Sequence, residues 1–435
     1  MIRVAVLLAA IALSVPAAAR AQADNAAVSE FEVAGIPVIF KPIRGNEVVA
    51  VRLYLDGGSA NLTPETAGIE RFIAAAAVRG TEKYTRDEFA ALSAATGTAI
   101  AADPNPDYTM VALQAVSAHW DQAWDLFTQA VLHPTFPADE VELVRAQIAN
   151  QLKARLDNPD AYLQVLANEL MYRGHPYAVD PAGTVEAIES LQVADLERWH
   201  RERLTKENLL LVVVGNVARE DLEAKIEAAF GSLPATGGAA GTIPSLASAG
   251  PTVEVTERDL PTNYIRGEFS TPHPGDPDYA AARVAIDILS DRLNEEVRTK
   301  RNLSYAVFAG LSQRRANYGL VYVTAVEPDT TLEVILHEIE RMKTEPITAE
   351  RLAENINVFL TLYWLGQETN MGQAATLGTF ELVGDGWENA AEFVRRVRAV
   401  TPADIQRVAE TYFKDIRFAV IGNPDGIDRT LFTSL

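Results

Sequence analysis

The chain of 435 residues contains no cysteine, and this absence excludes several kinds of site. Without a thiol there is no disulfide framework, no cysteine-ligated zinc, no thiol nucleophile and no iron–sulfur cluster. Positive charge is also scarce, because 38 Lys and Arg stand against 59 Asp and Glu, for a formal net charge of −21. Binding to phosphate backbones and to anionic lipid surfaces is driven by positive charge. We therefore expect no nucleic-acid partner.

Long apolar runs are missing except at the amino terminus. There, Arg3 precedes an apolar run at residues 4–15, and the small-residue segment Ala-Arg-Ala follows at residues 19–21. The run is too short to span a bilayer, but it has the length of the apolar part of a secretory signal peptide. We predict a cleaved signal peptide at residues 1–21, a periplasmic location and no membrane segment after its removal. A retained anchor is the alternative.

A segment poor in large side chains divides the chain. Residues 234–251, PATGGAAGTIPSLASAGP, are rich in Gly, Ala, Ser and Pro. Such a composition cannot bury enough apolar area to order itself. We predict a linker there, between an N-terminal domain at residues 24–233 and a C-terminal domain at residues 252–435.

Short motifs recur in the two halves at a nearly constant spacing. Ala-Asp-Leu at 194–196 returns as Ala-Asp-Ile at 403–405, and Gly-Asn at 215–216 returns at 422–423. A third motif, around Ala138, returns around Ala349. The three offsets are 209, 207 and 211 residues. A constant offset across unrelated local chemistry indicates duplication of one domain.

The order of strand-like and helical segments predicts the fold class. Strand patterns come first, at residues 31–40 and 48–55 in the first copy and 264–270 in the second. Long helical patterns follow, at residues 138–158 and 349–365. Runs of strands followed by runs of helices favour an α+β fold over a doubly wound parallel sheet. We predict two homologous domains, each a largely antiparallel sheet packed against helices.

The most informative segment is 57–81, GGSANLTPETAGIERFIAAAAVRGT. Thr63 and Pro64 suit a helix start, and the alanine-rich run up to Val78 suits a buried helix before the turn at Gly80. The segment resembles the insulinase/pitrilysin-like family of zinc peptidases. Within that family it is similar to the half-size bacterial members, which in turn resemble mitochondrial processing peptidase. Active members of the family carry the motif His-x-x-Glu-His within the corresponding segment.

The resemblance implies a metal site that has lost its ligands. Histidines four residues apart on a helix share one face and both reach a zinc ion, and the glutamate activates the bound water. Here these positions are Arg71, Ala74 and Ala75, while the family's third ligand, a glutamate, falls near Asn150 or Gln151. Alanine has no donor atom, and a protonated guanidinium repels a divalent cation. We predict that this chain holds no metal.

No other motif replaces that site. The sequence shows no serine-nucleophile elbow, phosphate-binding glycine loop or dinucleotide fingerprint, so a stand-alone hydrolase is the least favoured function. No two histidines stand at a chelating spacing on a helix. The six are His119, His133, His175, His200, His273 and His337.

The second half contains VRTKRNLSYAV at residues 297–307, in which Arg298 precedes Tyr305 by seven residues. This resembles the family's arginine and tyrosine pair, which lies in the domain that faces the zinc domain. The resemblance implies that Tyr305 helps to stabilise the tetrahedral oxyanion and that Arg298 orients substrate. A developing oxyanion needs a fixed donor about 3 Å away.

Two further features bear on the pair. Asn302 stands where the family usually has Gly, and Asn tolerates positive φ better than most residues. Arg301, Arg314 and Arg315 are additional candidates to line the same cleft. The alternative interpretation makes Tyr305 an amphipathic strand residue and Arg298 a solvent-exposed helix residue.

These features favour division of labour between chains. We predict the non-zinc-binding subunit of a heterodimeric zinc metallopeptidase, inactive alone, that supplies Arg298 and Tyr305 for proteolysis of peptides in an enclosed chamber. The expected partner is a homologous subunit that carries His-x-x-Glu-His and the zinc. The alternative is a non-catalytic peptide-binding or structural subunit of an envelope complex, comparable with inactive core subunits of respiratory complexes.

Overall fold

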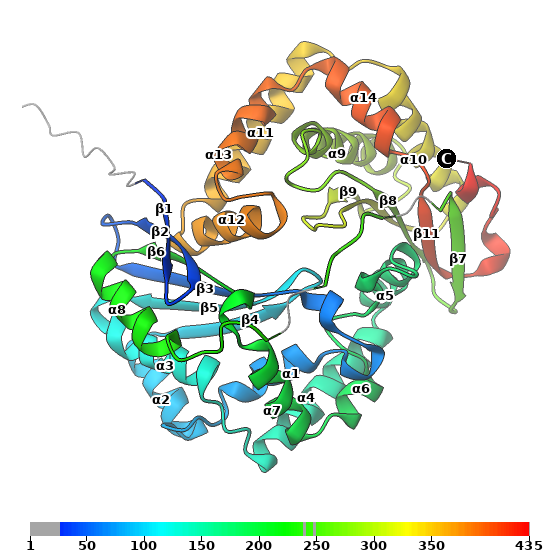
Figure 1. Ribbon diagram of the computed structural model, residues 1–435. Helices are drawn as coiled ribbons and strands as arrows, with labels where there is room; N and C mark the ends of the chain where they lie inside the picture. Colours follow the sequence, from blue (N-terminus) through cyan, green and yellow to red (C-terminus); the bar gives the residue numbers. More distant parts are fainter. Residues whose placement is uncertain (1–26, 238–240, 247–248, 435) are drawn as a thin grey trace, which may run out of the picture.

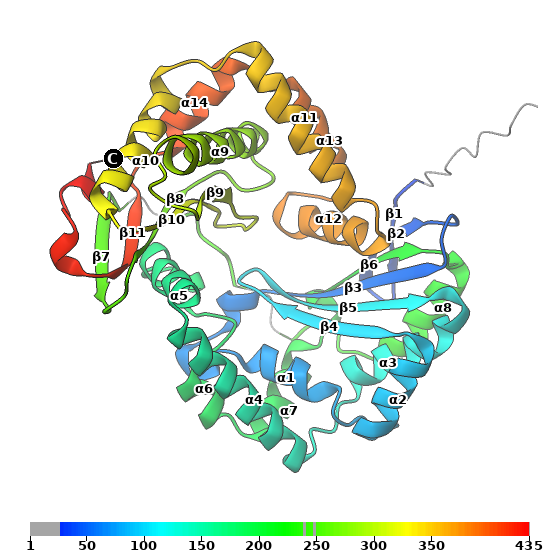
Figure 2. The same cartoon turned by 180° about the vertical axis from the view of Figure 1, so that it is seen from behind.

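The structure is a computed structural model that describes residues 27–237, 241–246 and 249–434. The predicted signal peptide at residues 1–21 lies outside the described residues. Each half of the chain forms one sheet covered by helices, and the two halves lie side by side, as Figure 1 and the reverse view in Figure 2 show. None of the helices in the described ranges has the length and apolar character needed to cross a membrane.

The N-terminal sheet has six strands in the order β1-β2-β6-β3-β5-β4. Every neighbouring pair is antiparallel except β2 and β6, which run parallel. The strands are β1 (Ser29–Val33), β2 (Ile36–Pro42), β3 (Val48–Asp56), β4 (Ala99–Pro104), β5 (Tyr108–Val116) and β6 (Leu209–Gly215).

The C-terminal sheet repeats this arrangement. Its order is β7-β11-β8-β10-β9, with β7 and β11 parallel and the other pairs antiparallel. It therefore matches the N-terminal sheet strand for strand once β1 is set aside, which confirms two copies of one largely antiparallel fold. The strands are β7 (Thr252–Glu257), β8 (Asn263–Ser270), β9 (Val307–Leu311), β10 (Tyr318–Ala325) and β11 (Arg417–Gly422).

The helices follow the same duplication. The N-terminal copy contains α1 (Ile69–Ala77), α2 (Arg86–Thr96), α3 (Trp120–Leu132), α4 (Ala138–Asp157), α5 (Pro159–Met171), α6 (Val185–Ser190), α7 (Val193–Arg203) and α8 (Arg219–Phe230). The C-terminal copy contains α9 (Tyr279–Leu293), α10 (Pro328–Thr344), α11 (Ala349–Gly366), α12 (Asn370–Val383), α13 (Asn389–Ala399) and α14 (Pro402–Tyr412). Helices α4 and α11 begin at the two positions that the repeat predicted, Ala138 and Ala349.

One strand expectation is wrong. Residues 31–40 form parts of two strands, β1 and β2, and not one. Ala34 and Gly35 between them have φ of 57° and 83°, so the chain reverses in a tight hairpin. Two successive positive φ values are typical of hairpin turns whose twist matches that of the flanking strands.

The two sheets exchange helices. The central strands β6 and β11 are buried along their whole length, which requires cover on both faces of each sheet. Helix α5 of the first half packs on β8 and β11 of the second, where Leu163 contacts the cluster around Ile421. Helix α12 of the second half packs on β3 and β6 of the first, with Leu377 in the cluster around Tyr54. Figure 1 shows both helices between the sheets.

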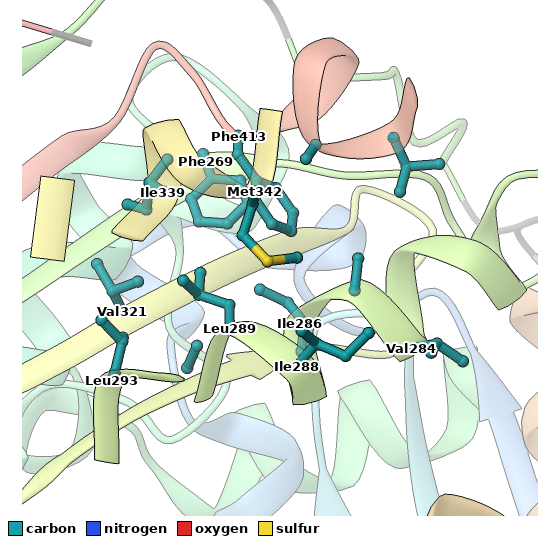
Figure 3. Close-up of a cluster of buried hydrophobic side chains, with 14 of the residues drawn as sticks. Phe269, Val284, Ile286, Ile288, Leu289, Leu293, Val321, Ile339, Met342 and Phe413 are labelled. Atoms are coloured by element: carbon teal, nitrogen blue, oxygen red, sulfur yellow. The ribbon is translucent and has the colours of Figure 1, made fainter. Parts of the chain in front are cut away.

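The largest core lies in the C-terminal half, between its sheet and helices α9 and α10. Figure 3 shows Leu289 of α9 near Met342 of α10 and Phe413, and Leu293 of α9 beside Val321 of β10, all of them buried. Helix α9 is apolar around most of its surface, as expected for a helix covered on several sides. This core fixes the end of α9, from which the chain continues into a π-helical segment, η6 (Asn294–Lys300), that carries Arg298.

The segment predicted as a linker connects α8 to β7. None of the described residues within 234–251 lies in a helix or strand, while residues 238–240 and 247–248 are outside the described part. The segment is not wholly solvent-exposed, because Ile243 and Leu246 pack against the cluster around Tyr172. His175 Nε2 also lies 2.9 Å from the Pro244 carbonyl oxygen. Some residues of this segment therefore contact the N-terminal half, and the domain boundary at residues 234–251 stays a prediction.

Candidate functional site

The helix that carries the degenerate metal positions begins later than the sequence predicted. Thr63 and Pro64 open a short 3-10 turn, and α1 itself starts after Gly68. Gly68 has φ of 84°, and a Cβ there would lie 2.7 Å from the Gly183 Cα. Only glycine therefore allows this close approach between the start of α1 and the 176–184 loop.

Arg71, Ala74 and Ala75 all lie on α1, and the guanidinium of Arg71 is held by two neighbours. Arg71 Nη1 donates to the Ala182 carbonyl oxygen at 3.1 Å, and Nη2 donates to Gln151 Oε1 on α4. The fold thus brings Arg71 next to one of the two residues at which the family's third ligand was expected.

These side chains do not fit a zinc ion. A guanidinium, two methyl groups and a neutral amide offer no imidazole or carboxylate donor. Within the described residues, no group of three or more His, Asp or Glu is placed to hold a metal. Burial lowers the pKa of Arg71, and repulsion from Arg155 adds a smaller effect in the same direction. Arg71 nevertheless places a positive charge at this site.

A buried carboxyl group lies beside Arg71 and was not predicted from the sequence. Glu70 is buried; its Oε2 accepts a hydrogen bond from Thr109 Oγ1, and its Oε1 accepts one from Trp199 Nε1 at 3.3 Å. Burial raises the pKa of Glu70, and the positive charge of Arg203 opposes that shift. A lone glutamate inside the apolar run of α1 is the sequence signal that could have marked it.

The second candidate centre is the pair Arg298 and Tyr305, which the structure brings into contact. The Arg298 guanidinium lies 4.2 Å from the centre of the Tyr305 ring, a cation–π distance. Tyr305 is 82% exposed and stands in the loop between η6 and β9. The tyrosine is therefore presented to solvent, on a different domain from α1.

A tight turn fixes the spacing of this pair. Asn302 has φ of 52°, in the left-handed region that the sequence reasoning considered for it. Its N–H donates to the Arg298 carbonyl oxygen at 3.2 Å, and the next N–H, of Leu303, donates to that of Val297 at 2.9 Å. The turn thereby closes η6 and directs the chain toward Tyr305 and β9.

The further arginines contact neighbours within the chain. Arg301 contacts Glu296 within the same turn. Arg314 Nη1 donates to the Tyr172 hydroxyl at 3.3 Å, and Arg315 Nη2 forms an ion pair with Asp56 at 2.9 Å. Arg314 and Arg315 thus join the two halves of the chain, which is a structural role.

The fold and the degenerate site define a member of a peptidase family. Two family descriptions match the chain: "Insulinase (Peptidase family M16)" over residues 38–184 and "Peptidase M16 inactive domain" over residues 190–359. The chain belongs to this insulinase-like metallopeptidase family.

Several similar proteins match this chain over most of their length. It is 22% identical over 409 residues to an uncharacterized zinc protease of Mycobacterium tuberculosis, covering 91% of this chain and 93% of the relative. The crystal structure of a peptidase M16 inactive domain from Pseudomonas fluorescens superposes with a TM-score of 0.83 at 21% identity, over 91% and 98% of the two chains. A chain of complex III2 from Candida albicans gives 0.78 at 16% identity, over 94% and 99%. At these identities the solved structures show a shared fold.

Proposed function

We propose that this chain is the non-zinc-binding subunit of a heterodimeric zinc peptidase and completes its partner's active site. One observation carries the proposal: Arg298 and Tyr305 form an exposed cation–π pair in a chain whose α1 has Arg71, Ala74 and Ala75 at the three positions of the family's zinc motif. At 82% exposure, the Tyr305 side chain is accessible to a substrate or a partner.

The geometry suits an oxyanion donor. The Tyr305 ring contacts the Arg298 guanidinium, and its backbone follows the turn at Asn302. A donor fixed before the reaction stabilises developing charge without reorganisation at the moment of reaction. The guanidinium adds positive charge beside the phenol, which favours an anionic transition state.

The proposed partner is a homologous subunit that carries His-x-x-Glu-His. Zinc bound there would supply activated water for hydrolysis of a peptide bond. Peptides enclosed between the two subunits are the proposed substrates, and residues 1–21 support a proposed periplasmic location. Without the partner, this chain should not bind zinc with sub-micromolar affinity and should not cleave peptides.

The test compares Tyr305→Phe with the native chain, each mixed with the zinc-bearing partner. Loss of one oxyanion donor should lower kcat roughly 10- to 1,000-fold. The matched control is Tyr264→Phe on β8, which removes a phenol hydroxyl at a partly buried position packed against α5. It should leave kcat unchanged.

An unchanged kcat for Tyr305→Phe would favour the alternative, a non-catalytic peptide-binding or structural subunit of an envelope complex. The likeness to a chain of complex III2 keeps that alternative in view. Stoichiometric zinc binding by this chain alone would contradict both accounts.

A further inference from the structure

A cavity of about 830 Å³ lies in the C-terminal half, between helices α9, α11, α12 and α13. Its volume falls in the range of ligand-binding pockets, about 300–1,000 Å³. Among the described residues that line it, none belongs to the degenerate metal positions or to the Arg298 and Tyr305 pair. The proposed function therefore does not explain this cavity.

Aromatic rings form one wall of the cavity. Phe359 and Tyr363 of α11 are stacked with 6.2 Å between their ring centres, and the ring of Phe393 of α13 lies 5.9 Å and 6.1 Å from them. Phe380 of α12 lies 5.6 Å from Phe393 and also lines the cavity. The faces of such rings attract apolar groups and cations.

One cation of the chain already uses this wall. The Arg283 guanidinium of α9 lies 5.7 Å from the centre of the Phe359 ring. Its Nη2 donates to Asp287 Oδ1 at 2.7 Å. The arginine thus contacts both a carboxylate and an aromatic ring, so this wall accommodates a positive charge that a carboxylate neutralises.

A second carboxylate on α9 has no such cation. Asp291 follows Asp287 by four residues, so both side chains project on one side of the helix, and both line the cavity. Asp291 is exposed, and among the residues that the structure describes its carboxylate has no ion pair or hydrogen bond. Burial raises the pKa of Asp287; Arg283 opposes that shift, and repulsion from Asp291 adds to it.

This arrangement leaves an excess of negative charge. The charged side chains on the described wall are one arginine and two aspartates, which sum to −1 when both aspartates are ionised. Two like charges four residues apart destabilise a helix. Helix stability therefore gives no reason for Asp291, whereas a bound cation would.

We infer that this cavity binds a small organic cation, whose ammonium or guanidinium group lies beside Asp287 and Asp291 and whose apolar body lies on the aromatic wall. Hydrogen bonds between ionised groups are stronger than those between neutral ones. Val358 and Leu362 are exposed on the same wall and add apolar area for the body of the ligand. An anion would be repelled by the unneutralised carboxylate.

The experiment measures binding by isothermal titration calorimetry with the purified chain lacking residues 1–21, without partner. The probes are phenylbutylamine, phenylbutanol and phenylbutyrate, each with the ring and the polar group at opposite ends of the chain. The protonated amine should bind at least about tenfold more tightly than the alcohol, the factor expected for one hydrogen bond to a charged group. Absent binding of the amine, equal binding of amine and alcohol, or tighter binding of the carboxylate would overturn the inference.

Asp291→Asn tests the location, because it removes the excess charge and keeps the shape of the side chain. It should weaken binding of the amine roughly tenfold and leave binding of the alcohol unchanged. The matched control is Asp157→Asn at the end of α4, which removes the same charge from another exposed position. The control should leave binding of both probes unchanged. Unchanged binding of the amine to Asp291→Asn would contradict the assignment.

A second variant supplies the missing cation from the chain itself. Val358 is 61% exposed, so Val358→Lys should fold and bring an ammonium group to the cavity wall. It should weaken binding of the amine roughly tenfold. Val326→Lys, at a position that is 73% exposed and not on this wall, is the control and should bind the amine like the native chain. Unchanged binding to Val358→Lys would place the amine elsewhere and overturn the inference.

Discussion

At the scale of the residue, the turn at Asn302 connects the two members of the exposed pair. Asn302 adopts φ of 52°, where a side chain with a branched Cβ is strained. Asn302→Val should therefore lower the free energy of unfolding by about 1–2 kcal/mol. Urea denaturation followed by circular dichroism measures this change.

The control for that substitution is Asn302→Gly, which accepts positive φ without steric cost. It should unfold close to the native chain and keep turnover with the partner. If Asn302→Val were as stable as Asn302→Gly, the positive φ at this residue would not affect the free energy of unfolding. The position of Tyr305 would then depend on other contacts.

At the scale of the element, the docking of α12 on the N-terminal sheet depends on one small residue. A Cβ at Gly378 would lie 2.3 Å from the Tyr54 hydroxyl oxygen and 2.4 Å from its ring. Tyr54 is fully buried, so a shift of its ring would disturb closely packed neighbours. Gly378→Val should displace α12 and lower the free energy of unfolding by about 2 kcal/mol or more, as overpacking does.

Gly366 at the end of α11 provides the comparison. A Cβ there meets nothing within 4 Å, so Gly366→Ala should stabilise the chain slightly, because Ala favours helix by up to about 1 kcal/mol. Chemical denaturation of both variants separates a packing effect from a general effect of replacing glycine. Similar stability of the two variants would show that α12 tolerates a side chain against Tyr54.

The sequence predicted the helices and strands better than it predicted which elements they pack against. The offset of 211 residues placed the starts of α4 and α11, because helix-start signals are local. The offset did not reveal that α5 packs on the C-terminal sheet and α12 on the N-terminal sheet. A repeat shows that both helices exist, but it does not show which surface each one covers. The hairpin at Ala34 and Gly35 was missed because its strands are short and only two residues separate them.

For a similar reason, the residue types of the site were predicted from the sequence but its packing was not. The residue types at Arg71, Ala74 and Ala75 exclude metal ligation without any knowledge of the fold. A cavity of about 370 Å³ lies beside them, between α1 and β4. It depends on the distance between these two elements and on Arg71 turning toward Gln151, which are properties of packing. Ala74 and Ala75 were expected inside a buried helix, but both are only half-buried.

At the scale of the whole molecule, the exchange of α5 and α12 ties the two halves together more directly than the segment between them does. Each sheet completes its second face with a helix from the other half. The contacts of Arg315 with Asp56 and of Arg314 with Tyr172 cross the same boundary. Separation would expose both apolar sheet faces to water, so the covalent connection is not what holds the halves in place.

This account predicts that the halves stay associated after the chain is cut between them. A recognition sequence for a site-specific protease inserted before Gly250 should be accepted, since a Cβ at Gly250 would meet nothing within 4 Å. After cleavage, both fragments should elute together in gel filtration, at the volume of the uncut protein. The same insertion in Gly378→Val is the informative comparison, because loosened α12 should let the cut fragments separate at lower urea. Two separate peaks from the otherwise native cut chain would show that the helix exchange is too weak to hold the halves, and that residues 234–251 do so.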